Sequence, residues 1–512
     1  MKTRAGKALA PCLLVAAVHL GVASGLAAGS GTDYRPPQFA NAENYLRVQF
    51  LPAARDWERM DIYVPKAAPQ ERLPCVVFFY GGGWGGKVMW GKDNTQLLLD
   101  SGYVVAVPDY VLGAQQPVPL AVWDGAAAIR FLRANAAKYR IDPERIAVIG
   151  LSAGGWLAQY LAPSDSATLW RQGRRGEPQF SIPMVEPHPA NAEFPARVAA
   201  FVTDWGAGRL GKSPGILNPG GQWLGPDDPP LFTCGPLPET FVPNGPQAYR
   251  AAGAIAEVAS VGKKAPTGGL VADVKNPHDY GHCLLGVAVK NYLTRDKTGK
   301  EVTFGERTLQ FLEEYVKRPR TASAPEIFPH GGPIPGPTAV RLRSVHPDAS
   351  IHFTLDGSDP ADRSPVFQQP LTAKPGDTLK AVATKPGLKP SPIATAAFVA
   401  APCAPPTITT TERLFQAKVG QPFSVSFQAT CDRAVSWYLS GKVAAKALEA
   451  VNPKVDNSKM KREPPWLALD PKTGVLSGTP PGPGVSVLIV TAQVAEGQTT
   501  LCDAVCVIVV AE

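Results

Sequence analysis

The sequence predicts an α/β fold with a mostly parallel central sheet, followed by two small all-β sandwich modules. Between about residues 45 and 317, short apolar runs alternate with helical patterns, which is typical of a parallel sheet with helices on both faces. Beyond a proline-rich stretch, the chain contains only short strand patterns separated by turns. At 512 residues, the chain is also longer than a single hydrophobic core supports.

Residues 1–28 are expected to be a secretory signal peptide. Lys2, Arg4 and Lys7 precede an apolar, small-residue stretch over residues 8–28. No later segment offers about twenty uninterrupted apolar residues, so we expect no membrane span. The mature protein is therefore expected to be secreted, periplasmic or held at the cell surface.

Charge and cysteine spacing narrow the expected partners. The formal net charge is +8, but the chain has no run rich in Lys and Arg, so nucleic acid is not an expected partner. No pair of cysteines has the CxxC spacing of a zinc site. We expect neither a metal nor a cofactor.

Residues 29–317 are expected to form the α/β domain. Its buried strands are predicted at four apolar runs, namely residues 76–79, 104–107, 146–149 and 198–202. An amphipathic pattern predicts a helix over residues 123–139, closed by a loop at residues 141–143. In such a sheet, ligands bind at the carboxyl ends of the strands.

The remaining chain is expected to form two β modules after a linker. Residues 318–337 are rich in Pro, Gly and Ser and show no hydrophobic period, so they predict the linker. Alternating patterns predict antiparallel sandwiches over residues 338–400 and 401–512. Trp437 and Trp466 could stack on sugars, but a single Trp in a sandwich more often belongs to the core.

A strand, a sharp turn and a helix surround Ser152. The sequence Gly150-Leu151-Ser152-Ala153-Gly154 directly follows the run at residues 146–149 and precedes a small-residue helix. This turn exposes a serine hydroxyl to a base, and flanking glycines avoid Cβ atoms that would clash there. Ser152 is therefore the expected nucleophile.

A glycine-rich segment at the end of the first strand predicts an oxyanion hole. Tyr80-Gly81-Gly82-Gly83-Trp84 follows the run at residues 76–79, and glycines let backbone N–H groups approach a ligand closely. We expect donors from Gly82 or Gly83 together with the N–H of Ala153, and contacts to the substrate from Tyr80 and Trp84. A phosphate loop is not favoured, because no Lys-Ser or Lys-Thr pair follows.

The base and the acid should follow the serine in the chain. The other histidines lie in the leader, in a proline-rich insertion or beyond the domain, which leaves His278 and His282. We prefer His282, which follows a glycine, and His278 remains an alternative base. Glu239 is the first carboxylate after the strand at residues 230–234 and is the expected acid. Its rivals are Asp227, Asp228 and Asp279.

Together these motifs resemble the α/β-hydrolase superfamily, in the branch of hormone-sensitive-lipase-like and feruloyl or acetyl-xylan esterases with an HGGGW loop. The family's acid motif falls on Glu239, upstream of Val242-Pro243, and its histidine falls on His282. Three departures stand out: Tyr80 in place of the usual His, Glu239 in place of Asp, and a Pro/Arg-rich insertion at residues 163–195, which could partly cover the acyl pocket.

The resemblance implies a secreted serine carboxylic-ester hydrolase acting on short acyl esters such as acetylated polysaccharide. Residues 354–360 resemble the β-sandwich appended to chitobiase-type glycosidases, and residues 469–480 resemble Ig-like, cadherin-like repeats of bacterial surface proteins. Both modules could contact glycan or the cell surface, or serve as spacers. Two alternatives remain, a prolyl-oligopeptidase-like serine peptidase and an inactive surface-binding protein.

Overall fold

A computed structural model of the chain describes residues 36–51, 59–67, 72–81, 92–110, 118–151, 153–162, 171–172, 178–181, 190–204, 225–235, 245–260, 262–264, 270–271, 292–329, 331–334, 336–400, 406–410, 412, 414–439, 465–494 and 500–512. The expected signal peptide lies outside these residues.

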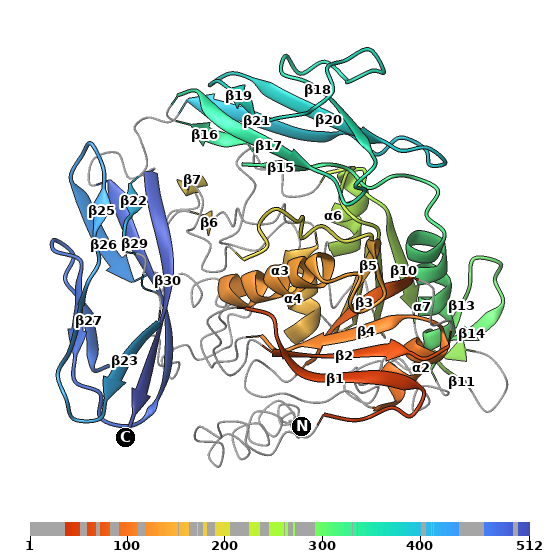
Figure 1. Cartoon of the computed structure of the whole chain (residues 1–512), viewed down its shortest axis with the longest axis horizontal. Coiled ribbons are helices and arrows are strands. Elements are labelled where there is room, and N and C mark those ends of the chain that lie inside the picture. Colours follow the sequence, from red (N-terminus) through yellow and green to blue (C-terminus); the bar gives the residue numbers. More distant parts are fainter. Residues whose placement is uncertain are drawn as a thin grey trace, which may run out of the picture. The chain divides into compact units, whose positions relative to one another are not determined.

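The central sheet has eight strands in the order β1-β2-β4-β3-β5-β8-β9-β10 (Figure 1). They are β1 (Ala42–Gln49), β2 (Arg59–Pro65), β3 (Leu73–Phe79), β4 (Val104–Pro108), β5 (Ile141–Leu151), β8 (Ala200–Asp204), β9 (Leu231–Gly235) and β10 (Ala256–Ser260). The strands from β4 to β10 in this order are parallel, and β1 and β2 pair antiparallel at one edge. The predicted mostly parallel sheet is confirmed.

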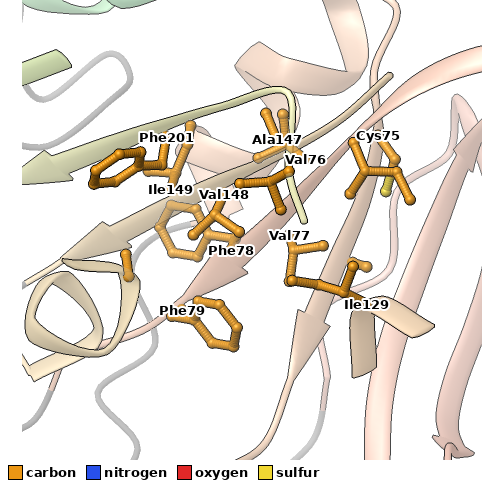
Figure 2. Close-up of a cluster of buried hydrophobic side chains, with 14 of the residues drawn as sticks. Cys75, Val76, Val77, Phe78, Phe79, Ile129, Ala147, Val148, Ile149 and Phe201 are labelled. Carbon is orange, nitrogen blue, oxygen red and sulfur yellow. The ribbon is translucent and has the colours of Figure 1, made fainter. Parts of the chain in front are cut away.

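The sheet is buried on both faces around its centre. Every residue of β3 is buried, as expected for a central parallel strand with an unbroken apolar sequence. Successive side chains of a strand point to opposite faces. Figure 2 shows Val77 and Phe79 on the side of Ile129, which belongs to a helix packed on the sheet.

Helices connect the parallel strands. These are α2 (Lys92–Asp100), α3 (Val118–Ala134), α4 (Ala153–Leu161) and α6 (Gly245–Ala251), while α7 (Phe304–Leu312) and the π-helical turn η3 (Glu313–Lys317) come after the last strand of the sheet. The connection through α2 runs from β3 to β4, and the one through α3 runs back past β3 to β5. Because parallel crossovers are right-handed, α2 lies on one face and α3 and α4 on the other (Figure 1). No helix in the described part of the chain is long and apolar enough to cross a membrane.

The helix predicted over residues 123–139 is shifted in the structure. It begins at Val118 and ends at Ala134, and turns follow up to Arg140, which has a φ of 54°. Ala136 and Tyr139 are buried although they lie outside the helix, so apolar residues beyond its end extended the predicted pattern. The loop predicted at residues 141–143 is instead the start of β5. A four-stranded sheet of β11 (Gly262–Lys264), β12 (Leu270–Val271), β13 (Tyr292–Arg295) and β14 (Glu301–Thr303) completes this part of the chain.

The second module is a sandwich of two small sheets around an apolar core. One sheet consists of β15 (Glu326–Phe328), β17 (Thr338–Arg343) and β19 (Leu371–Ala373); the other of β16 (Gly332–Ile334), β21 (Ala394–Ala400), β20 (Thr378–Thr384) and β18 (Ser350–Thr354). The prediction that residues 318–337 form a linker is therefore wrong. This range contains strands β15 and β16, and the side chains of Ile327 and Ile334 are buried in the core of the module.

The C-terminal module contains β22 (Thr407–Ile408), β23 (Leu414–Lys418), β24 (Phe423–Ser426), β25 (Ala429–Thr430), β26 (Val435–Leu439), β27 (Leu467–Leu469), β28 (Val475–Gly478), β29 (Gly484–Val494) and β30 (Thr500–Ala511). Trp437 belongs to its core, and Trp466 packs edge-on against Phe423. The buried Trp437 ring is therefore not free to stack on a sugar ring, whereas Trp466 is only partly buried against the core.

Side chains at the amino end of β5 bind the second module. The Glu144 carboxylate lies 2.6 Å from Lys385 Nζ and 2.9 Å from His346 Nδ1. His346 Nε2 accepts a hydrogen bond from the Ser323 N–H at 3.0 Å. This contact fixes His346 between the two parts of the chain.

A buried charge cluster continues this contact. Glu326 is 1 % exposed and lies 2.7 Å from Arg343 Nε. Arg133, at the end of α3, donates to the carbonyls of Pro195 and Arg197. Burial lowers the pKa of Arg133 to about 10, and the negative charge of Glu326 opposes this shift. The second module thus supplies a carboxylate that stabilises a buried arginine of the α/β domain.

Candidate active site

The expected site lies where β3, β4 and β5 end. Tyr80 follows β3, Asp109 follows β4, and Leu151 is the last residue of β5. The three strands are parallel neighbours, so their carboxyl ends meet at one edge of the sheet. Ser152 itself lies outside the described residues, between β5 and α4.

The glycines on either side of Ser152 are required by close backbone contacts. A Cβ atom on Gly154 would lie 2.2 Å from the carbonyl oxygen of Phe79 and 2.6 Å from that of Tyr80. A Cβ atom on Gly150 would lie 2.2 Å from the carbonyl oxygen of Gly154. The expectation that side chains would clash at these positions is confirmed. The start of α4 therefore touches the backbone at the end of β3.

Ala153 is the first residue of α4 and is 4 % exposed. The N–H groups of the first helical turn have no acceptor within the helix, and the helix dipole favours negative charge there. A backbone donor at this point suits an oxyanion. The role of the Ala153 N–H as that donor stays a prediction.

Tyr80 lies in the core. It is 2 % exposed, and its ring stacks on Tyr110 with centroids 4.7 Å apart. The Tyr110 hydroxyl donates to the Tyr80 carbonyl at 2.6 Å. The burial does not fit the expected contact of Tyr80 with substrate, because core packing occupies its ring.

The Tyr80 hydroxyl resists ionisation. Burial, reinforced by the negative charge of Asp109, raises the pKa of Tyr80 well above its ordinary value. Hydrogen bonding to the Asp109 side chain adds to this rise, and hydrogen bonding to the Tyr110 backbone opposes it. Tyr80 therefore stays neutral.

Sequence reasoning missed the residues that surround Asp109. The Arg47 guanidinium pairs with the Asp109 carboxylate, whose side chain is 8 % exposed. The Arg47 N–H in turn donates to Asp61 Oδ1 at 2.8 Å. The signal available was Asp109 itself, a carboxylate directly after a buried strand; nothing in the sequence singles out Arg47.

The other predicted site residues lie outside the described residues. These are Ser152, His282 and its alternative His278, Glu239 and its rival Asp279, and Gly82, Gly83 and Trp84. They stay predictions. Strand β9 ends at Gly235, so the segment leading to Glu239 leaves the sheet at the same edge as the segment leading to Ser152.

Two rivals of Glu239 lie at the opposite edge. Asp227 and Asp228 precede β9, so they are at the amino ends of the parallel strands. Asp228 Oδ2 accepts the Gly225 N–H at 2.8 Å, and Asp227 lies 3.6 Å from Arg197. Both carboxylates hold the loop before β9, and we set them aside as triad acids.

Two strands of the insertion at residues 163–195 join the C-terminal module. Strands β6 (Arg171–Gln172) and β7 (Pro178–Ser181) form a hairpin, and β7 pairs in parallel with the start of β30. Cover of the acyl pocket by the rest of the insertion stays a prediction. Within the described residues, no group of three or more His, Cys, Asp or Glu side chains could hold a metal ion.

The comparisons with known proteins agree with the modular layout. Residues 60–185 match the BD-FAE family, residues 340–398 the Fn3 associated family and residues 405–501 the He_PIG Ig domain family. The resemblance stated from the sequence is thereby confirmed. Over these ranges the chain is similar to a BD-FAE domain followed by Fn3-associated and Ig-like domains.

Curated relatives match over a limited length. Carboxylesterase NlhH of Mycobacterium tuberculosis is 36% identical over 103 residues, which are 20% of this chain and 32% of that protein. Esterase LipI of the same organism is 30% identical over 195 residues, 33% of this chain and 57% of that protein. A solved truncated form of carbohydrate esterase from gut microbiota has 19% identity and a TM-score of 0.36, covering 44% of this chain and 90% of that chain. The chain thus spans about a third of NlhH and a little over half of LipI.

Proposed function

We propose that this chain is a serine carboxylic-ester hydrolase. The observation that carries the proposal is the backbone contact of Gly154 with Phe79 and Tyr80. It brings the segment after Ser152 against the segment that leads to Gly82 and Gly83. A nucleophile and oxyanion donors must lie within a few ångströms of one carbonyl group. The esterase names of the relatives support the same activity.

The proposed reaction proceeds through an acyl-enzyme. His282, oriented by Glu239, takes the Ser152 hydroxyl proton while Ser152 Oγ bonds to the ester carbonyl carbon. The carbonyl oxygen becomes an oxyanion, which the N–H groups of Gly82 or Gly83 and Ala153 stabilise. The ester C–O bond then breaks, and His282 gives its proton to the leaving alcohol. In the second half of the reaction, His282 takes a proton from water, the water oxygen attacks the carbonyl carbon of the acyl-enzyme, and the bond to Ser152 Oγ breaks. The carboxylic acid leaves, and Ser152 regains its proton from His282.

The proposed substrates are short acyl esters such as acetylated polysaccharide, met outside the cytoplasm. Support comes from the expected signal peptide and from the two β modules that follow the α/β domain. Trp437 is buried in the core of the C-terminal module, and Trp466 is partly buried against that core. The proposed role of the two modules is therefore that of spacers, or of contacts with glycan and the cell surface made mainly by other residues.

The test compares the mature protein with Ser152→Ala on p-nitrophenyl acetate, butyrate and octanoate and on acetylated xylan. Activity on short esters that Ser152→Ala abolishes supports the esterase, and acetate release from xylan supports the polysaccharide substrate. Turnover of proline peptides alone would favour the peptidase, and a folded but wholly inactive protein the surface-binding alternative.

A second set of variants assigns the base and the acid. His282→Ala is compared with His278→Ala, and Glu239→Gln with Asp279→Asn, by kcat on p-nitrophenyl acetate. We expect loss of activity in His282→Ala and Glu239→Gln. A loss confined to His278→Ala or Asp279→Asn would reassign that role.

A further inference from the structure

Arg47 has an unusual backbone conformation for its residue type. Its φ is 53°, and the pairing of β1 with β2 shifts register between Tyr45 and Val48. A non-glycine residue in the left-handed region costs energy and persists only where its surroundings hold it. Asp61, which is 1 % exposed, accepts the Arg47 N–H and so holds this bulge.

The bulge directs the Arg47 side chain to the end of β4. Bulges re-aim side chains and are frequent beside active sites. The Arg47 guanidinium pairs there with Asp109, whose N–H donates to the Arg59 carbonyl at 2.8 Å. Asp109 is thus fixed through both its backbone and its carboxylate.

Asp109 acts on Tyr80 through its neighbour in the chain, Tyr110. The Tyr110 ring stacks on the Tyr80 ring with centroids 4.7 Å apart, and the Tyr110 hydroxyl donates to the Tyr80 carbonyl at 2.6 Å. That carbonyl lies beside Gly154 at the start of α4. Gly81, the next residue, is buried and leads into the segment expected to supply the oxyanion donors.

We propose that Arg47 and Asp109 are positioning residues that hold the oxyanion turn, Gly81-Gly82-Gly83, through Tyr80. Tyr80 occupies the position at which the family has His. In this arrangement a fixed Asp109 keeps Tyr80 in place, and Tyr80 in turn fixes the start of the glycine segment that follows it. The inference rests on the proposed esterase function. Oxyanion donors act only within about 3 Å of the developing charge, and a displacement of about 1 Å can cost about 100-fold in rate.

The test compares Arg47→Gln with Arg140→Gln in the full mature chain. Arg140 is a matched control, because its φ is 54° and its guanidinium bonds the Pro65 carbonyl and Glu43 far from the oxyanion turn. For Arg47→Gln we expect kcat on p-nitrophenyl acetate to fall about 10- to 100-fold with KM changed less than about twofold. Arg47→Lys, which retains a cation for Asp109, should recover part of the loss. Thermal unfolding shows which variants are folded at the assay temperature.

Each outcome decides between the two proposals. If wild type hydrolyses no ester, the proposed function fails and the positioning role fails with it. If wild type is active, Ser152→Ala is inactive and Arg47→Gln behaves like Arg140→Gln, the positioning role is overturned while the esterase stands. Should Arg47→Gln not fold, Asp109→Asn is measured in its place. An unchanged kcat in folded Asp109→Asn would likewise overturn the inference.

Discussion

The two ends of β5 make different kinds of contact. The carboxyl end leads into the Ser152 turn, where the glycine backbone packs against the backbone at the end of β3. Near the amino end, the Glu144 carboxylate binds Lys385 and His346 of the second module. The carboxyl end leaves no space for one added carbon atom at Gly150 or Gly154. The amino end makes ion pairs that partly face solvent, since the side chains of Glu144 and Lys385 are 22% and 18% exposed.

The two ends of this one strand therefore have different roles: one positions groups of the expected active site, and the other stabilises the fold. A contact between backbone atoms fixes distances in the site, and small displacements there act on the transition state. Contacts at the other end stabilise the fold without touching the site. Substitutions at the two ends should therefore have different effects: loss of rate at the carboxyl end, and loss of stability with full rate at the amino end.

The largest effect is expected from Gly154→Ala. The added Cβ would meet the Phe79 carbonyl oxygen at 2.2 Å, and a backbone atom cannot move aside cheaply. We expect kcat/KM on p-nitrophenyl acetate to fall by about 100-fold or more, and the free energy of unfolding to fall by about 1–3 kcal/mol. Gly336→Ala is the control, because its added Cβ would have no heavy atom within 4 Å. Full activity in Gly154→Ala would contradict the contact between the two turns.

The next effect, from Glu326→Gln, concerns stability. It removes the carboxylate beside Arg343 and near Arg133, and an uncompensated buried charge costs about 3 kcal/mol. Urea unfolding should show that loss, while kcat of the folded variant stays at the wild-type value. The control is Glu314→Gln, whose carboxylate is 47% exposed beside Lys297. A lowered kcat in folded Glu326→Gln would show that the two ends of β5 are coupled.

The sequence predicts the carboxyl end of β5 better than the amino end. Apolar runs predict β3, β4 and β5, because a parallel strand buried on both faces needs an unbroken apolar sequence. The GxSxG pattern predicts the close contact of Gly150 with Gly154, because these residues lie close together in the chain, whereas the contact of Gly154 with Phe79 joins distant segments. The strands and the contact of Gly150 with Gly154 are the parts of the fold and the site that local sequence determines.

Contacts between distant segments could not be predicted in this way. Arg47 is not a residue type that signals a positive φ, and its bulge depends on Asp61 in the next strand. Residues 318–337 have the composition of a linker, yet β15 and β16 form because partners elsewhere, β17 and β21, bury them. The contact of Glu144 with Lys385 joins residues 241 positions apart, which no local pattern reveals.

A smaller loss of stability is expected from Glu144→Gln. The change weakens the hydrogen bonds of Glu144 to Lys385 and His346. Because the Glu144 and Lys385 side chains are partly exposed to solvent, we expect the free energy of unfolding to fall by only about 1 kcal/mol. The control is Glu43→Gln, whose carboxylate is 46% exposed and 3.4 Å from Arg140. Urea unfolding of both variants measures the difference. Equal stability of the two variants would show that the Glu144 contact adds nothing to that of an exposed pair.

The smallest effect is a change in the pH dependence of stability from Lys385→Met. Burial opposes the charge of Lys385, but hydrogen bonds to Asp348 and Glu144 outweigh it and raise the pKa of Lys385 above 10.5. A raised folded pKa stabilises the protein fully below the unfolded value, and this contribution is lost as pH rises through the folded value. Urea unfolding from about pH 8 to about pH 11.5 should therefore show an advantage of wild type over Lys385→Met that shrinks above about pH 10.5. An advantage that stays constant across this range would mean that packing of the lysine stem, and not its charge, holds the second module at the amino end of β5.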